Sequence, residues 1–179
     1  MAIYAKEIAR RMGISGEAQQ MLYYIALLHD IGKIGIPDNI LNKPGSLTEE
    51  ERKIIQKHST IGGSILKDFN SIPGIAEGAM YHHERYDGKG YDTGLSGNDI
   101  PLFARIICVA DAFDAMSSAR CYRKKLTKSK IIQEIVDNAG AQFDPAITKH
   151  ILDMIEDDII PVTVKAEEDY TYKEFSYEY

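Results

Sequence analysis

The sequence predicts an all-α fold, a compact bundle of about seven helices. Apolar residues recur every three to four positions over most of the chain, and no clear run alternates apolar and polar residues as a half-buried strand would. Residues typical of helix starts and stops stand between these segments. With 179 residues, 44% of them hydrophobic, the chain can bury a sizeable single core without disulfides.

Five helical segments are expected before residue 85. The first covers residues 3–12 and ends at Gly13, and the second covers residues 17–30. Thr48 and Glu51 form a capping-box pattern, which predicts a helix that ends near His58. Two further helical segments are expected at residues 61–69 and 75–84.

The stretch 85–98 contains four glycines and is expected to be irregular. Pro101 then opens a long apolar helix at residues 102–117. Thr127 can cap a helix over 131–138, and Asp144 with Pro145 can open a last helix that ends near Ile155.

After Pro161 the chain becomes acidic and rich in tyrosine. We therefore expect one domain at residues 1–160 and a separate tail at 161–179. Composition leaves three interpretations of the tail open: a frayed end, a segment that docks on the domain, or a partner-binding segment.

Charge and composition exclude several classes of protein. The balance of 21 Lys+Arg against 27 Asp+Glu gives a net charge of −6, which argues against a DNA- or RNA-binding surface. Two cysteines, Cys108 and Cys121, make neither a disulfide framework nor a thiolate zinc site. No membrane-spanning apolar run and no signal peptide are evident, so we expect a cytoplasmic protein without membrane contact.

Histidines and carboxylates lie together at the ends of apolar helical segments. His29 and Asp30 end one segment, His82 and His83 end another, and Asp111 lies inside the apolar helix 102–117. Burying such groups costs free energy unless something compensates them. Imidazole and carboxylate are good ligands for Fe, Mn or Zn, so a shared divalent metal site is one such compensation.

For any one histidine taken alone, a capping or surface residue is favoured over a metal ligand. The metal interpretation gains weight because the alternative needs three separate buried polar clusters with unrelated partners. His58 is ambiguous by itself and is included only on the strength of the other residues. His150, beside the last helix, is expected to be a surface or capping residue.

These residues, in this order, resemble the HD-GYP family, bacterial metal-dependent phosphodiesterases of the wider HD phosphohydrolase superfamily. The match runs from about Ile3 to Asp153. It rests on His29-Asp30-Ile31-Gly32-Lys33, on His82-His83-Glu84 with Asp87-Gly88-Lys89-Gly90-Tyr91, and on Asp111 with Ser117, Arg120, Tyr122 and Arg123.

The resemblance implies an all-helical HD domain, with a Gly-rich loop near a centre of two or three divalent metal ions, usually iron or manganese. It implies hydrolysis of cyclic di-GMP to the linear dinucleotide pGpG, often on to GMP, through a metal-activated hydroxide. It also implies that a diguanylate cyclase or a sensor or receiver domain could be a partner. A homodimer is also possible.

The resemblance also implies a role for each matching site residue. Asp30 would bridge two metals, His29 and Asp111 would hold the first, and His58, His82 and His83 would complete the second. Lys33 would contact the scissile phosphate, so Asp30 and Lys33 are the catalytic candidates. The substrate groove would be formed by Asp87, Gly88, Gly90, Tyr91, Arg120 and Arg123.

The sequence departs from the family pattern at three positions. Asp92 replaces the proline of the Gly-Tyr-Pro triplet, which frees the backbone and adds a charge. Cys121 stands where proline is usual. No histidine precedes His29, whereas the family supplies a further ligand from its first helix.

These departures leave two other functions open beside the phosphodiesterase. One is a catalytically impaired module that senses cyclic di-GMP or docks a partner. The other is a phosphohydrolase that acts on another cyclic dinucleotide or phosphoester.

Overall fold

The computed structural model describes residues 1–91, 93–118 and 126–157, and their regular structure is helical. Apart from an isolated bridge between Ala139 and Phe143, no strand pairing occurs in these ranges. The helices are α1 (Ala2–Arg11), α2 (Gly16–Leu28), η1 (Ile31–Gly35), α3 (Asp38–Leu41), α4 (Glu49–Gln56), α5 (His58–Leu66), α6 (Ile75–Tyr81), η2 (Gly97–Asp99), α7 (Leu102–Ser117), α8 (Lys128–Asp137) and α9 (Pro145–Glu156), where η marks a 3-10 helix. The all-α prediction is confirmed.

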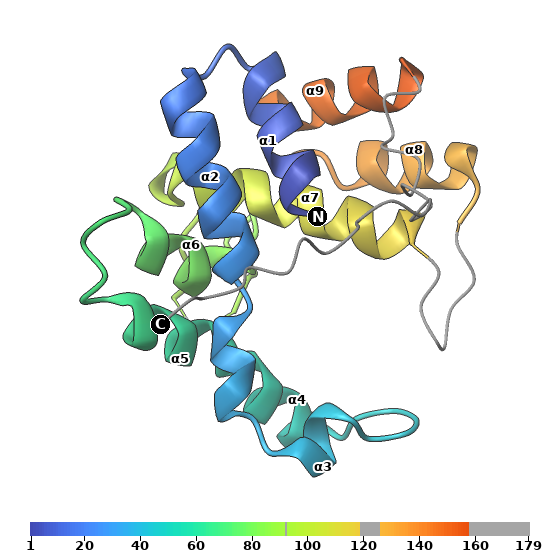
Figure 1. The fold of residues 1–179 in the computed structure, drawn as a ribbon. Helices are drawn as coiled ribbons and strands as arrows, with labels where there is room; N and C mark the ends of the chain where they lie inside the picture. The colour runs from blue at the N-terminus through green and yellow to red at the C-terminus, as the bar shows by residue number, and fades with distance from the viewer. Residues whose placement is uncertain (92, 119–125, 158–179) are drawn as a thin grey trace, which may run out of the picture.

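The long helix α7 passes through the centre of the bundle (Figure 1). It packs against α1, α6, α8 and α9, while α1 and α2 also pack together. Ile8, Leu22, Ile25, Phe113 and Ile147 are fully buried in this core. Helices α3 and α4 lie at the end of the molecule away from α8 and α9 (Figure 1).

Three of the predicted helix starts are made by the residues expected to cap them. Thr48 Oγ1 accepts from the Glu51 amide at 3.3 Å, and the Glu51 carboxylate accepts from the Thr48 amide at 2.8 Å. Thr127 accepts from the Lys130 amide, and Asp144 accepts from the Ala146 amide. These local contacts satisfy amides that a helix start leaves unpaired.

Several helix boundaries differ from the prediction. α5 covers His58–Leu66 instead of 61–69, and only Lys57 separates it from α4. α8 starts at Lys128 instead of 131, directly after its cap Thr127. α6 ends at Tyr81 instead of near Glu84, so His82 is its C-cap residue. The short helices η1 and α3 were not predicted; a segment of 4 or 5 residues is too short for a helical period to show.

Glycines let η1, α5 and α6 approach one another closely. A Cβ at Gly32 would collide with the backbone carbonyl of His58 and the backbone of Gly62. A Cβ at Gly62 would stand 3.3 Å from Ala79 of α6 and 3.3 Å from the backbone nitrogen of Gly32. This close packing brings together the residues that follow α2, start α5 and end α6.

Cys108 lies buried in α7. The candidate positions Asp92, Arg120, Cys121 and Arg123 and the tail 161–179 lie outside the described residues. Within the described residues, every helix is too short or too polar to cross a membrane.

Candidate metal centre

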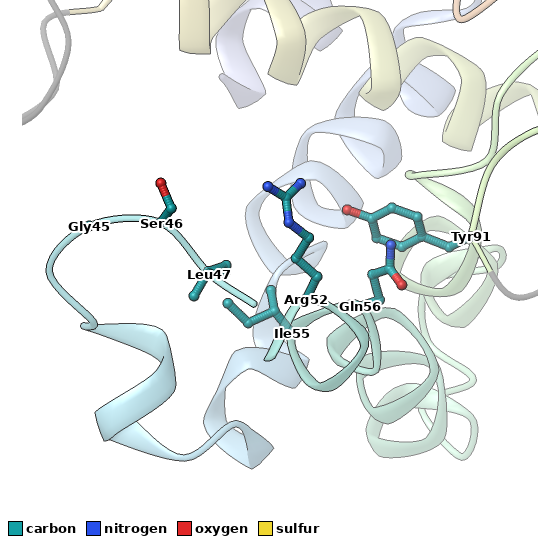
Figure 2. Close-up of a pocket in the computed structure, with 7 residues that line it drawn as sticks. All are labelled: Gly45, Ser46, Leu47, Arg52, Ile55, Gln56 and Tyr91. Carbon is teal, nitrogen blue, oxygen red and sulfur yellow. The ribbon is translucent and has the colours of Figure 1, made fainter. Parts of the chain in front are cut away.

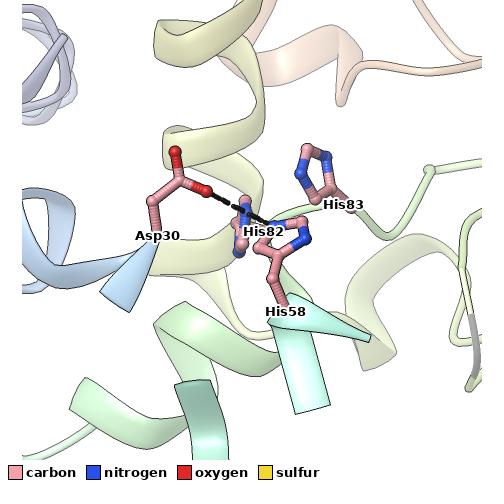
Figure 3. Close-up of side chains that lie close together, drawn as sticks. All are labelled: Asp30, His58, His82 and His83. Carbon is pink, nitrogen blue, oxygen red and sulfur yellow. Dashed lines mark hydrogen bonds and ion pairs between the residues drawn. The ribbon is translucent and has the colours of Figure 1, made fainter. Parts of the chain in front are cut away.

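The Asp30 carboxylate lies at the centre of a cluster of imidazoles. Its Oδ1 is 3.3 Å from His58 Nε2 and 3.9 Å from His82 Nε2. Asp30, His58, His82 and His83 each offer a ligand atom within 4.8 Å of the others (Figure 3). Asp30 follows α2, His58 starts α5, and His82 and His83 follow α6, so the cluster depends on the packing around Gly32.

The other Asp30 oxygen faces a second group of residues. Oδ2 is 3.2 Å from His29 Nε2, which in turn lies 4.0 Å from Oδ1 of Asp111 on α7. The Lys33 ammonium also donates to Oδ2, at 2.5 Å. The six predicted ligands therefore divide into a cluster of four and an adjoining pair, His29 and Asp111, with Asp30 between them.

Three of the imidazoles are held in the same way by their own helices. Nδ1 of His29, His58 and His82 lies 2.8, 2.6 and 2.8 Å from the carbonyl oxygen three residues earlier, respectively that of Ala26, Ile55 and Ala79. Because a carbonyl oxygen can only accept, Nδ1 must carry the proton in all three rings. Each neutral ring then presents the lone pair of Nε2 to the cluster.

Among the described residues, this arrangement leaves these three Nε2 atoms without a hydrogen-bond donor. Nε2 of His58 and Nε2 of His82 are 3.3 Å apart, and in the neutral rings both are acceptors, so neither can donate to the other. His29 Nε2 is buried 3.2 Å from Asp30 Oδ2, and in the neutral ring both of these atoms are acceptors too. Divalent cations would satisfy these lone pairs, so the donor set fits metal ions.

Burial keeps most of the rings neutral. It lowers the pKa of His58, and burial together with the neighbouring His83 lowers that of His82 further. Burial also lowers the pKa of His83 to about 4. Near neutral pH these three rings are therefore in the form that binds metals.

The pKa values of Asp30 and His29 shift in the directions expected for an ion pair. Burial acts to raise the pKa of Asp30, but His29 and Lys33 outweigh it and hold the pKa well below its ordinary value. Burial acts to lower the pKa of His29, and the Asp30 carboxylate outweighs it and raises the pKa. Asp30 is thus an anion at neutral pH, the form in which a carboxylate binds metal ions.

The glycine-rich loop after α6 covers one side of the cluster. The Tyr91 ring lies against the His83 ring with centroids 4.5 Å apart and planes 32° from parallel. Gly88 has a positive φ of 74°, and a Cβ at Gly90 would stand 2.5 Å from the Cα of Glu84. Glycine at these positions lets the loop fold back and place Tyr91 over the histidine.

Asp87, a predicted substrate contact, has partners inside the loop. Its carboxylate accepts two hydrogen bonds from the Arg85 guanidinium, at 3.0 and 2.9 Å, and one from the Lys89 amide at 3.1 Å. The Arg85 hydrogen bonds lower the pKa of Asp87 to about 2. This geometry assigns Asp87 a role in holding the loop, while a substrate contact stays a prediction.

Sequence reasoning did not assign a role to Glu84. This residue is 3% exposed, and its Oε1 accepts from the amide and hydroxyl of Thr93 at 3.2 and 2.5 Å. It thereby ties the start of the loop to its middle at Thr93. The only sequence signal was its place directly after the two histidines.

Comparison with known proteins identifies the fold and family of this arrangement. A family model described as "HD domain" matches residues 1–147. A cyclic di-GMP phosphodiesterase response regulator of Xanthomonas campestris is 42% identical over 154 residues, which are 85% of this chain and 41% of that protein. A 3'3'-cGAMP-specific phosphodiesterase of Vibrio cholerae is 37% identical over 155 residues, covering 86% of this chain and 30% of that protein.

A solved structure of similar fold is that of an HDGYP protein from Bdellovibrio bacteriovorus. The two structures superpose with a TM-score of 0.68 at 23% sequence identity. The match covers 87% of this chain and 51% of the Bdellovibrio chain. The chain spans less than half the length of the two curated relatives above. The HD domain match covers the whole metal-centre cluster, from His29 to Asp111, and an HD domain implies binding of divalent metal. By its sequence and fold, this chain belongs to the HD domain family.

Proposed function

We propose that this chain is a metal-dependent phosphodiesterase that hydrolyses cyclic di-GMP to linear pGpG, GMP or both. The observation that carries this proposal is the convergence of imidazole Nε2 atoms, held in one tautomer, on the two oxygens of Asp30. A structural role alone gives no reason for so many buried lone pairs to face one carboxylate.

Two divalent ions, Fe or Mn before Zn, would be held by the residues around Asp30. His29 and Asp111 would hold one, while His58, His82 and His83 would hold the other, and Asp30 would bridge them. The family resemblance also allows for a third divalent ion at this centre. Bound ions would lower the pKa of water and offset charge on the phosphate.

Lys33 is the protein cation nearest to this centre among the described side chains. Its ammonium already pairs with Asp30 Oδ2, and 42% of its side chain is exposed. A phosphate placed beside Asp30 would meet this ammonium, which would offset the charge that develops on the phosphoryl oxygens. Arg120 and Arg123 are proposed as further phosphate contacts on the strength of the family resemblance.

The relatives' names support a cyclic dinucleotide as the substrate, since one acts on cyclic di-GMP and another on 3'3'-cGAMP. We favour cyclic di-GMP. We also propose a domain at residues 1–160 with the tail 161–179 outside it, a cytoplasmic location, and a diguanylate cyclase or a sensor or receiver domain as partner.

The test is product formation from cyclic di-GMP by protein loaded anaerobically with Fe(II) or Mn(II). We expect pGpG or GMP at a rate that chelation abolishes, and we expect Asp30→Ala to lose both bound metal and hydrolysis. Retained hydrolysis in Asp30→Ala would contradict the proposal. Tight nucleotide binding without any product would instead identify a cyclic di-GMP receptor.

A further inference from the structure

A pocket of about 410 Å³ lies beside the metal centre, between α4, the loop that precedes it and Tyr91 (Figure 2). Its size falls in the range of small-molecule sites. None of the residues that line it belongs to the predicted ligand set, and Tyr91 alone was among the predicted substrate contacts.

Two contacts join this pocket to the metal centre. The Tyr91 ring lines the pocket and also lies against the His83 ring, 4.5 Å between centroids. Ile55 lines the pocket with its side chain, and its carbonyl oxygen accepts the hydrogen bond from His58 Nδ1. A substrate with its phosphate at Asp30 would therefore have the pocket directly beside it.

The pocket combines the side chains that recognise nucleobases. Tyr91 provides an aromatic ring, and Leu47 and Ile55 provide apolar surface. Arg52 and Gln56, one turn apart on α4, line the same pocket; in Figure 2 the Gln56 amide points toward the Tyr91 ring and the Arg52 side chain projects into the open space beside it. Proteins that bind unpaired bases stack them on aromatic rings and read their edges with guanidinium and amide groups.

Arg52 is available for such a contact. It is the charged residue among those that line the pocket. Its ion pair with Glu49 is long, at 3.9 Å, and lies on the surface. Exposed pairs of this kind contribute little to stability, so the guanidinium can turn to a ligand at small cost.

We propose that this pocket binds one guanine base of the dinucleotide, with Arg52 as the residue that selects guanine. This inference rests on the proposed function. A guanidinium only donates, and guanine presents two acceptors, O6 and N7, on one edge. Adenine presents an acceptor and a donor there, and its amino group would face the Arg52 donors. Gln56 has both a donor and an acceptor and can pair with another edge atom.

The test compares cyclic di-GMP with cyclic di-AMP in the full chain loaded with Mn(II). For Arg52→Gln, we expect the ratio of kcat/KM for the two substrates to shift toward adenine by roughly 5- to 100-fold, the discrimination of one bidentate contact. The effect should fall mainly on KM. The loss on cyclic di-GMP should also exceed any loss on bis(p-nitrophenyl) phosphate, which has no base.

Lys53→Gln is the matched control, because Lys53 is an exposed cation at the next position of α4 and does not line the pocket. It removes the same charge and should leave the substrate ratio unchanged. An equal shift in both variants would assign the effect to long-range charge and overturn the proposal, as would an unchanged ratio in Arg52→Gln.

Equilibrium binding separates this inference from the proposed function. Calorimetry should show that wild-type protein binds pGpG more tightly than Arg52→Gln does, again by roughly 5- to 100-fold, without requiring turnover. Binding of this kind with no hydrolysis would refute the phosphodiesterase proposal and keep the guanine pocket. Hydrolysis with equal binding by both proteins would refute the pocket alone.

Discussion

The imidazoles of His29, His58 and His82 share one constraint, a hydrogen bond from Nδ1 to a carbonyl of the preceding turn. That bond determines both the tautomer and the direction of the ring, so the ligand atoms are oriented before any ion binds. Such preorganisation lowers the free-energy cost of binding, since little side-chain freedom remains to be lost.

At this scale we predict that His82→Ala loses metal and activity together. Removing one Nε2 from the cluster should lower cyclic di-GMP hydrolysis by about 100-fold or more and reduce the metal content measured by mass spectrometry. His150→Gln, on α9, is the matched histidine control and should keep both. Full metal content in His82→Ala would show that this residue is not a ligand.

A second residue-scale prediction concerns the Asp87 carboxyl, whose pKa of about 2 is held down by Arg85. A carboxyl with a pKa lowered on folding stabilises the folded state at neutral pH. That stabilisation should fade as the pH falls from about 4, the unfolded value, to about 2. Carboxyl-carbon NMR should show Asp87 titrating near 2.

Arg85→Ala tests the cause of this shift. Without the guanidinium, the Asp87 carboxyl should titrate closer to its unperturbed value of about 3.9. If Asp87 titrates near 4 in the wild-type protein as well, the pair does not hold the loop in solution.

At the scale of elements, the centre depends on how closely η1 lies against α5. Gly32 stands where any Cβ would meet the backbone of His58 and Gly62, and backbone atoms cannot rotate away as a side chain can. Glycine is therefore required here by the close packing of the two helices and not by a special backbone conformation.

We predict that Gly32→Ala destabilises the fold by about 3 kcal/mol, since the clash forces η1 and α5 apart. The melting temperature measured by calorimetry should fall by roughly 10 °C. Gly16→Ala is the matched control: nothing lies within 4 Å of a Cβ there, and the residue starts α2, so stability should stay equal or rise slightly. A Gly32→Ala melting temperature equal to that of wild type would contradict this packing.

At the scale of the whole molecule, the predicted ligands come from the ends or interiors of four separate elements. His29 and Asp30 follow α2, His58 starts α5, His82 and His83 follow α6, and Asp111 lies within α7. Ions bound among them would link these helices directly, in addition to the packing of the apolar core. Metal should therefore stabilise the complete fold.

We predict that Mn(II) at about 100 times its dissociation constant stabilises the chelator-treated protein by about 3 kcal/mol. This corresponds to a rise of roughly 5 to 10 °C in melting temperature by calorimetry. Asp30→Asn keeps the size of the side chain but lacks the bridging charge, and it should show little or no rise. A metal-independent melting temperature in the wild-type protein would argue against an integral metal centre.

Local sequence patterns predicted much of the fold. The capping box at Thr48 and the helix at 102–117 match the structure, because caps and apolar periods depend on neighbours within a few residues. The short helices η1 and α3 were missed because 4 or 5 residues are too few to show a helical period. The start of α5 at His58 was missed because packing against other elements decides it.

The sequence by itself determined the helical class, because apolar spacing along a helix is a local property. It also named the candidate metal ligands, through clustered polar residues at helix ends and through the family resemblance, and their roles stay predictions. Only the tertiary structure decided that one Asp30 oxygen faces His58 and His82 while the other faces His29 and Lys33. It also decided that Arg52 and Gln56 share a pocket with Tyr91. These contacts join residues far apart in the chain, and they form only when close packing at Gly32 and Gly90 brings separate elements together.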